Sequence, residues 1–121
     1  MAARRGRILV VDDNRINRMT IERVLAQEGY FVATAENGRQ ALDLLGAEAF
    51  DVVLLDILMP EMDGYEALAR IKQDASQHHV PVIMISAVEE MDSVVRCIEM
   101  GAADYLPKPF NPALLRARIN A

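Results

Sequence analysis

The chain has few of the features that would place it outside a reducing compartment or in a membrane. Its single cysteine, Cys97, cannot form an internal disulfide and favours the cytoplasm. The apolar run from Ile8 to Val11 is too short for a signal peptide or a membrane span. Basic residues are also fewer than acidic ones, 13 against 18, and the resulting net charge of -5 gives no electrostatic reason to expect direct nucleic-acid binding. We therefore expect a cytoplasmic domain that contacts neither membranes nor nucleic acids.

The composition is that of one compact domain with its own core. Apolar residues make up 52% of the 121 residues, a length that fits one domain and leaves little room for a second. A domain of this size buries roughly two-thirds of its unfolded surface, so folding needs no metal or disulfide. We expect a single domain over residues 1–121, with its core from about residue 7 to residue 121. It either stands alone or is excised from a longer multidomain protein.

Short apolar runs alternate with segments whose apolar residues recur at helical spacing. Five runs predict strands: Arg7–Val11, Phe31–Ala35, Phe50–Leu55, Val80–Ile85 and Asp104–Leu106. Each is followed by an expected helix, with apolar faces that include Ile16, Met19, Ile21, Val24 and Leu25 in the first and Met91, Val94, Val95 and Ile98 in the fourth. This alternation predicts an α/β fold, a doubly wound (βα)5 domain with a parallel five-stranded sheet covered by helices on both faces.

Polar residues interrupt the apolar runs where the predicted strands end. They are Asp12 and Asp13 after the first strand, Asp56 after the third, Ser86 after the fourth and Lys108 just past the fifth. Parallel strands all end at the same edge of a sheet, and ligands bind in the crevice there. The topology therefore predicts that these five side chains lie close together.

This set of side chains has the chemistry of phosphoryl transfer to an aspartate. Two carboxylates about 4 Å apart repel each other by on the order of 4 kcal/mol at an effective dielectric constant near 20, so the acidic cluster calls for a cation or a raised pKa. Mg²⁺ prefers such oxygen ligands on an open rim and keeps several waters. Lys108 supplies a fixed positive charge and Ser86 a hydroxyl donor for a phosphoryl group.

Taken singly, each of these residues has an ordinary structural interpretation. Acids such as Asp12 and Asp13 favour a helix N-terminus, and Asp56 suits the start of a turn. Ser86 suits a loop hydroxyl and Lys108 a solvated surface lysine. Their coincidence at one sheet edge is what favours the functional interpretation.

Five separated motifs in order resemble the response-regulator receiver family of two-component signalling, over nearly the whole chain from about Arg7. They are Ile8-Leu9-Val10-Val11-Asp12-Asp13-Asn14; Asp51-Val52-Val53-Leu54-Leu55-Asp56; Met59-Pro60 with Asp63-Gly64; Val82-Ile83-Met84-Ile85-Ser86-Ala87; and Gly101-Ala102-Ala103-Asp104-Tyr105-Leu106-Pro107-Lys108-Pro109-Phe110. The resemblance implies a flavodoxin-like, CheY-like sheet with strand order 2-1-3-4-5.

The same resemblance implies roles for the site residues. Asp56 would be the phosphoacceptor, and Asp13 and Asp56 would ligate Mg²⁺ directly, together with the backbone carbonyl of Leu58. Asp12 would act on the metal largely through water. Lys108 would pair with the phosphoryl oxygens, aided by a cis bond between Lys108 and Pro109.

The resemblance also implies a switch. Ser86 would move toward the phosphoryl group and Tyr105 would rotate inward behind it, which couples the chemistry to the surface of the fourth helix, fifth strand and fifth helix. The expected partners are a histidine kinase or a histidine phosphotransfer protein, an output domain in cis or in trans, and a second copy through that surface. The chain would be a signalling switch that catalyses only its own phosphorylation and dephosphorylation, and otherwise not an enzyme.

Leu58 lies two residues after Asp56, where its side chain bears on the lifetime of the phosphoryl group and on one alternative function. Its apolar side chain is expected to shield the acyl phosphate from water, with Val88 acting beside it. A phosphohydrolase of the haloacid dehalogenase type would carry a second acid at the position of Leu58, and its absence argues against that enzyme. The other alternative is a receiver that only binds proteins without being phosphorylated, and the complete set of site residues argues against it.

Overall fold

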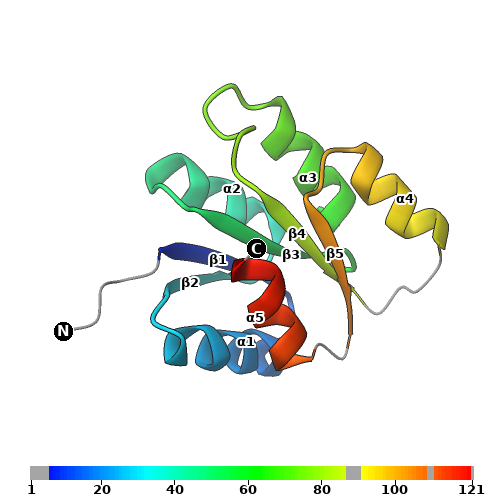
Figure 1. The fold of residues 1–121 in the computed structure, drawn as a ribbon. Coiled ribbons are helices and arrows are strands. Elements are labelled where there is room, and N and C mark those ends of the chain that lie inside the picture. The colour runs from blue at the N-terminus through cyan, green and yellow to red at the C-terminus, as the bar shows by residue number, and fades with distance from the viewer. Residues whose placement is uncertain (1–5, 87–90, 109–110, 121) are drawn as a thin grey trace.

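The computed structural model describes residues 6–86, 91–108 and 111–120, along which five strands and five helices alternate (Figure 1). The elements in chain order are β1 (Arg7–Val11), α1 (Arg15–Gln27), β2 (Phe31–Ala35), α2 (Gly38–Ala47), β3 (Val52–Asp56), α3 (Gly64–Gln73), β4 (Val82–Ser86), α4 (Met91–Glu99), β5 (Asp104–Pro107) and α5 (Pro112–Asn120).

All strand pairs are parallel, and the strand order is β2-β1-β3-β4-β5. The predicted fold class and strand order are therefore confirmed. In the register of the central strands, Leu55 lies opposite Val11 on one side and Met84 on the other. The strands are aligned so that the acidic end of β3 lies beside the end of β1.

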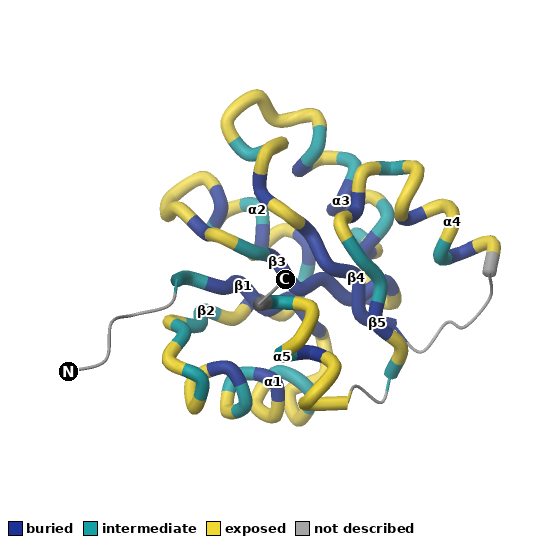
Figure 2. Tube along the Cα trace, in the orientation of Figure 1, coloured by how far each residue is buried: buried dark blue, intermediate teal, exposed yellow. Residues whose placement is uncertain are grey.

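Two apolar layers hold the helices to the sheet, and the sheet forms the buried centre of the molecule (Figure 2). Successive strand residues point to opposite faces, so Leu9 and Val11 pack into one layer while Ile8 and Val10 pack into the other. Helices α2, α3 and α4 cover the first face, and α1 and α5 cover the second (Figure 1). Because both faces are covered, the strands are almost continuously apolar.

The predicted strand boundaries were wrong by one or two residues at β3 and β4, and β5 ends one residue later than predicted, at Pro107. Phe50 and Val80 are buried but precede their strands, which start at Val52 and Val82. Pro81 has no N–H to donate to a neighbouring strand, which is consistent with a strand that begins after it. Both strands also end one residue later than predicted, so Asp56 and Ser86 are the last residues of β3 and β4 rather than the first residues after them.

The predicted apolar face of α1 was partly wrong. Ile21 and Leu25 are buried against the sheet as expected, but Ile16 is 74% exposed and Met19 is also exposed. Both exposed residues lie in the first half of the helix, which begins directly after the acidic edge. Apolar spacing alone therefore overestimated the length of the packed face.

The predicted apolar face of α4 was wrong at two of its four residues; Val94 is half-buried, and the side chain of Met91 lies outside the described part of the chain. Val95 and Ile98 are exposed, whereas Ser93 and Cys97, one turn apart, are buried. The helix therefore buries two small residues rather than the larger side chains of Val95 and Ile98. A hydrophobic spacing rule does not select such a face, because serine counts as polar in it.

Several helix ends follow the sequence. The side chain of Asn37 accepts a hydrogen bond from the N–H of Gln40 at 2.8 Å and caps α2. Asn111 caps α5 in the same way, ahead of Pro112 as its first residue. Beyond the end of α1, Gly29 takes a φ of 92°, a conformation that glycine adopts without strain.

Candidate functional site

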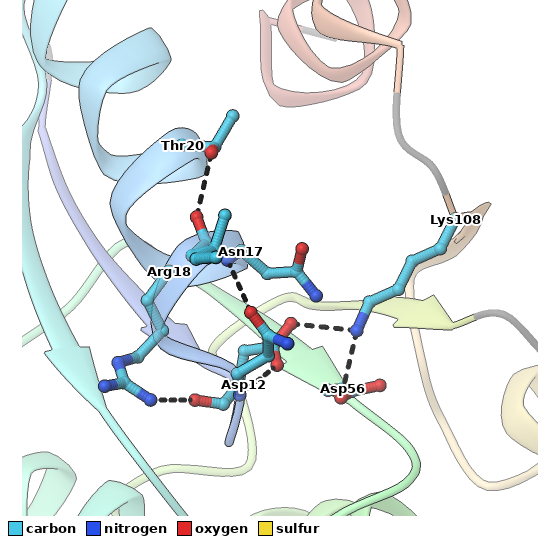
Figure 3. A network of polar contacts seen from close by, with 8 residues as sticks. Asp12, Asn17, Arg18, Thr20, Asp56 and Lys108 are labelled. Carbon is cyan, nitrogen blue, oxygen red and sulfur yellow. Dashed lines mark hydrogen bonds and ion pairs between the residues drawn. The ribbon is translucent and has the colours of Figure 1, made fainter.

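Four of the five polar side chains predicted to meet lie together at the carboxyl edge of the sheet, those of Asp12, Asp13, Asp56 and Lys108. Asp12 directly follows β1, Asp56 ends β3, and Lys108 follows β5 (Figure 3). The Lys108 ammonium lies 2.9 Å from a carboxylate oxygen of Asp12 and 3.1 Å from one of Asp56. The Lys108 ammonium thus bridges two acids that are 44 residues apart in the chain.

Two of the three acids are buried, and all three are close enough to share a metal ion. Asp12 and Asp56 are buried, with Asp56 only 4% exposed, while Asp13 is exposed. One carboxylate oxygen from each of the three lies within 4.8 Å of the others. Three hard oxygen donors in this space, open to water on the side of Asp13, fit a small divalent cation such as Mg²⁺.

Burial and charge in this cluster shift the pKa values of Asp56 and Lys108. Its burial and the nearby charge of Asp12 raise the pKa of Asp56 from its ordinary value of 3.8 to about 6, against the opposing charge of Lys108. Burial alone would lower the pKa of Lys108, but hydrogen bonds and charges from Asp12 and Asp56 outweigh it, so this pKa is raised. Lys108 therefore stays positive, while Asp56 is harder to ionise than an ordinary aspartate.

Asp12 is held by contacts that the sequence did not reveal. One of its carboxylate oxygens accepts the N–H of Asn14 at 2.8 Å, and its main-chain carbonyl accepts a hydrogen bond from the Arg18 guanidinium at 2.7 Å (Figure 3). Arg18 lies one turn along α1 from Asn14, which caps that helix. These contacts fix the direction of the Asp12 side chain toward Lys108.

Gly64 supports the other side of the site. Its N–H donates to the carbonyl oxygen of Ile57 at 2.7 Å, so the start of α3 closes directly onto the end of β3. A Cβ atom at Gly64 would lie 2.2 Å from the main-chain oxygen of Asp56 and 2.6 Å from the Cα of Ile57. Only glycine allows this approach, and the sequence identified the position merely as turn chemistry.

The remaining predicted residues occupy three different environments. Ser86 is fully buried at the end of β4, and its main-chain oxygen accepts the N–H of Lys108 at 2.8 Å. Tyr105 is half-buried on β5; burial raises the pKa of its hydroxyl, against the opposing effect of hydrogen bonds with Ser93 and Ser86. Leu58 is 59% exposed beside the acidic cluster. The predicted cis bond at Pro109 and the predicted role of Val88 fall outside the described residues.

Within the part of the chain that the structure describes, helices are too short or too polar to cross a membrane.

Residues 8–120 match the family model of the response regulator receiver domain. The transcriptional regulatory protein CpxR of Escherichia coli (strain K12) is 45% identical over 117 residues, which cover 96% of this chain and 48% of that protein. The response regulator PleD of Caulobacter vibrioides is 38% identical over 116 residues, 96% of this chain and 26% of that protein. The chain thus spans less than half the length of these two relatives.

Solved structures of signalling proteins have the same fold as this chain. The chemotaxis protein CheY4 of Vibrio cholerae superposes with a TM-score of 0.91 at 30% identity, over 98% of both chains. The receiver domain of the Francisella response regulator 1452 superposes with a TM-score of 0.89 at 30% identity, over 95% of this chain and 93% of that one. The family model matches residues 8–120 of the chain, and the acids of the chain lie at the edge where this fold binds ligands. The chain therefore belongs to the response-regulator receiver domains of two-component signalling.

Proposed function

We propose that Asp56 accepts a phosphoryl group from a phosphohistidine, in a Mg²⁺-dependent step that switches a distant surface. The observation that carries the proposal is the position of the Lys108 ammonium, which contacts both Asp56 and Asp12 at the end of the sheet. It supplies a fixed positive charge at the place where a phosphoryl group on Asp56 would bring negative charge. Such a charge stabilises the transition state of phosphoryl transfer.

The transfer exchanges one bond to phosphorus for another. A carboxylate oxygen of Asp56 attacks the phosphorus atom, the bond from phosphorus to the histidine nitrogen breaks, and that nitrogen keeps the electron pair. Lys108 then exchanges its contact with Asp56 for a phosphoryl oxygen. Ser86 turns its hydroxyl to donate to a second one, as the family resemblance implies. The chain catalyses only this transfer and the later hydrolysis, and is otherwise a switch.

The metal site is formed by the three acids and one main-chain carbonyl. Asp13 and Asp56 would hold Mg²⁺ directly with the carbonyl of Leu58, and Asp12 would contact it through water. When bound, the metal neutralises negative charge on the acids and on the phosphoryl oxygens. The spacing of the carboxylate oxygens, within 4.8 Å of each other, supports this ligand set.

Exposed apolar side chains on three helices support the proposed partners. Ile16 and Met19 project from α1 next to the acidic edge, where a histidine kinase or histidine phosphotransfer protein would have to dock. Val95, Ile98 and Leu114 are exposed on α4 and α5. We assign them to an output domain, in cis or in trans, or to a second copy of the chain. The single cysteine supports a cytoplasmic location.

The alternative is a receiver that binds its partners without being phosphorylated. The intact geometry of Asp56, Lys108 and Asp12 argues against it, since a site with no chemistry would have no need for a buried ion pair of this kind. Phosphorylation decides between the two. A phosphohydrolase is disfavoured by Leu58, because that position would need an acid.

The direct test uses a small phosphodonor. Incubation with acetyl phosphate and Mg²⁺ is expected to add one phosphoryl group, seen as a mass increase and as an acid-stable, base-labile adduct. Asp56→Asn is expected to give no adduct, because an amide oxygen is not a nucleophile of comparable strength, and EDTA is expected to prevent labelling of the wild type. An equal adduct on Asp56→Asn, or none on the wild type, would contradict the proposal.

The exposed side chain of Leu58 is expected to set how long the phosphoryl group persists. Leu58→Asn places a polar side chain beside the acyl phosphate and is expected to speed its hydrolysis by up to about tenfold, or about 1.4 kcal/mol of activation free energy. Loss of phosphorylated protein after removal of the donor measures this rate. Leu58→Met keeps an apolar shield and serves as the control. A rate for Leu58→Asn that equals or falls below the wild-type rate would show that Leu58 does not shield the site.

A further inference from the structure

The loop between β3 and α3 holds one residue in a strained backbone conformation. Glu61 has a φ of 66°, and it is the one residue other than glycine with a positive φ in the described part of the chain. It is the middle residue of a three-residue turn in which the Met62 N–H donates to the Pro60 carbonyl at 2.8 Å. A turn of this kind with a positive φ at its middle residue is rare and strained. Such a conformation persists only where surrounding contacts hold the residue in it.

This loop is closed at its base, directly beside the acidic edge. It follows Asp56, the last residue of β3, and Leu58 is its second residue. At the other end of the loop, the Gly64 N–H donates to the carbonyl oxygen of Ile57 at 2.7 Å. A change of backbone shape in the middle of the loop is therefore taken up between these two fixed ends, in the segment that contains Leu58.

The side chain of Met62 packs the loop onto the start of α2. Met62 is half-buried and lies against the apolar layer on this face of the sheet. It also lies directly on Gly38, the buried first residue of α2, because a Cβ atom at Gly38 would lie 2.8 Å from the Met62 sulfur and 3.2 Å from the Met62 Cβ. Beside this contact is an open cleft of about 400 Å³, whose lining includes the exposed residues Pro60 and Glu61. Met62 therefore joins the strained part of the loop to α2, while its two neighbours face open space.

We propose that Met62 and Gly38 are positioning residues of the metal site, whose contact holds the loop in its strained turn and so places the main-chain carbonyl of Leu58 at the acidic edge. The inference rests on the proposed metal site. A main-chain ligand cannot turn toward a metal by changing a side-chain rotamer, so its position depends on the shape of the whole loop. Leu58 lies three residues before Glu61, and a relaxed turn would move its carbonyl away from the place where the metal needs it.

The affinity for Mg²⁺ measures the position of the loop. Met62→Ala removes the contact with Gly38 and is expected to weaken Mg²⁺ binding about five-fold, since the strain of one such residue shifts an equilibrium by at least that order. Met62→Leu keeps the volume of the side chain and is expected to bind within about two-fold of the wild type. Gly38→Ala crowds Met62 from below and is expected to weaken binding about three-fold. Gly46→Ala is the matched control in the same helix, where a Cβ atom meets nothing within 4 Å, and it is expected to leave the affinity unchanged.

A second substitution separates positioning from a general loss of packing. Glycine takes a positive φ without strain, so a loop with Glu61→Gly keeps its turn without the contact between Met62 and Gly38. Adding Met62→Ala to Glu61→Gly is therefore expected to change the Mg²⁺ affinity by less than about two-fold. Glu61→Gln removes the same charge but keeps the strain, and adding Met62→Ala to it is expected to cost the full five-fold, to about the same extent as in the wild type.

The outcomes distinguish this proposal from the proposed metal site. If wild-type protein does not bind Mg²⁺, the metal site and the positioning role fail together. If the wild type binds Mg²⁺ but Met62→Ala and Gly38→Ala bind it as tightly as Gly46→Ala, the positioning role alone is wrong. A loss of affinity in Met62→Ala that is just as large beside Glu61→Gly would also overturn it. Urea unfolding checks that each variant is folded, and Gly38→Ala, which removes no side chain, gives the same comparison if Met62→Ala does not fold.

Discussion

Gly64→Ala is expected to lower the free energy of unfolding by about 3 kcal/mol and to abolish Mg²⁺ binding, although it adds only one methyl group. The new Cβ would lie 2.2 Å from the main-chain oxygen of Asp56, far inside van der Waals contact. Neither the strand nor the first turn of α3 can yield cheaply, because the Gly64 N–H is bonded to Ile57 at 2.7 Å. The clash is therefore relieved, at a high cost, by moving the end of β3 at Asp56 and the loop after it that carries Leu58.

The chain offers a control for this substitution. Gly46 lies in α2 with nothing within 4 Å of a Cβ atom, so Gly46→Ala adds the same methyl group without a clash. We expect it to stabilise the protein by about 0.5 to 1 kcal/mol, the difference in helix propensity. Urea unfolding measures both variants, and Mg²⁺ titration measures the site. A Gly64→Ala protein as stable as the wild type would show that the approach of α3 to β3 is not as close as described.

Asp56→Asn is expected to stabilise the protein in the absence of divalent cations, although it destroys the phosphoacceptor. Raising the pKa of Asp56 from 3.8 to about 6 means that its ionised form costs the folded state about 2 to 3 kcal/mol. The amide removes this charge while Lys108 keeps its contact with Asp12 at 2.9 Å. The free energy of unfolding of the variant should exceed that of the wild type by about this amount at neutral pH.

The pH dependence gives this prediction its sign. The folded protein binds the Asp56 proton more tightly than the unfolded chain does, so ionisation destabilises the fold. The cost is absent below about pH 3.8 and complete above about pH 6, and the advantage of the variant should grow across that window. Mg²⁺ should stabilise the wild type and not the variant. Asp43→Asn, at an exposed ion pair with Arg39, is the control, with an expected change below about 0.5 kcal/mol. A difference between Asp56→Asn and the wild type that does not change with pH would contradict the explanation.

The sheet and the acidic edge could be predicted because both depend on properties local to each strand. An apolar run that ends in a polar residue is visible in the sequence, and parallel topology then brings Asp56, Ser86 and Lys108 to one place without knowledge of any side-chain contact. Acids that share one crevice also made a raised pKa expected in the cluster, although burial contributes more than the neighbouring acids to the raised pKa of Asp56. These predictions needed the strand order but not the packing.

The packing of the helices could not be predicted in the same way. Helical spacing marks Val95 and Ile98 as well as it marks a true core position, and only the neighbouring elements decide which side of α4 is buried. The contact of Tyr65 with Ser93 joins residues 28 positions apart through two hydroxyls that no hydrophobic pattern selects. The approach of Gly64 to Asp56 depends on a distance between two backbones, which residue type alone does not give.

The position of Cys97 makes the native protein its own reporter of movement in α4. The thiol is fully buried in the layer between α4 and the sheet, and burial raises its pKa, which suppresses the reactive thiolate. It is also the single cysteine of the chain, so a thiol reagent has one target. The rate of alkylation then measures how often α4 opens far enough to expose the thiol. Comparing that rate with and without a phosphoryl group shows how phosphorylation changes the opening, and it needs no engineered label.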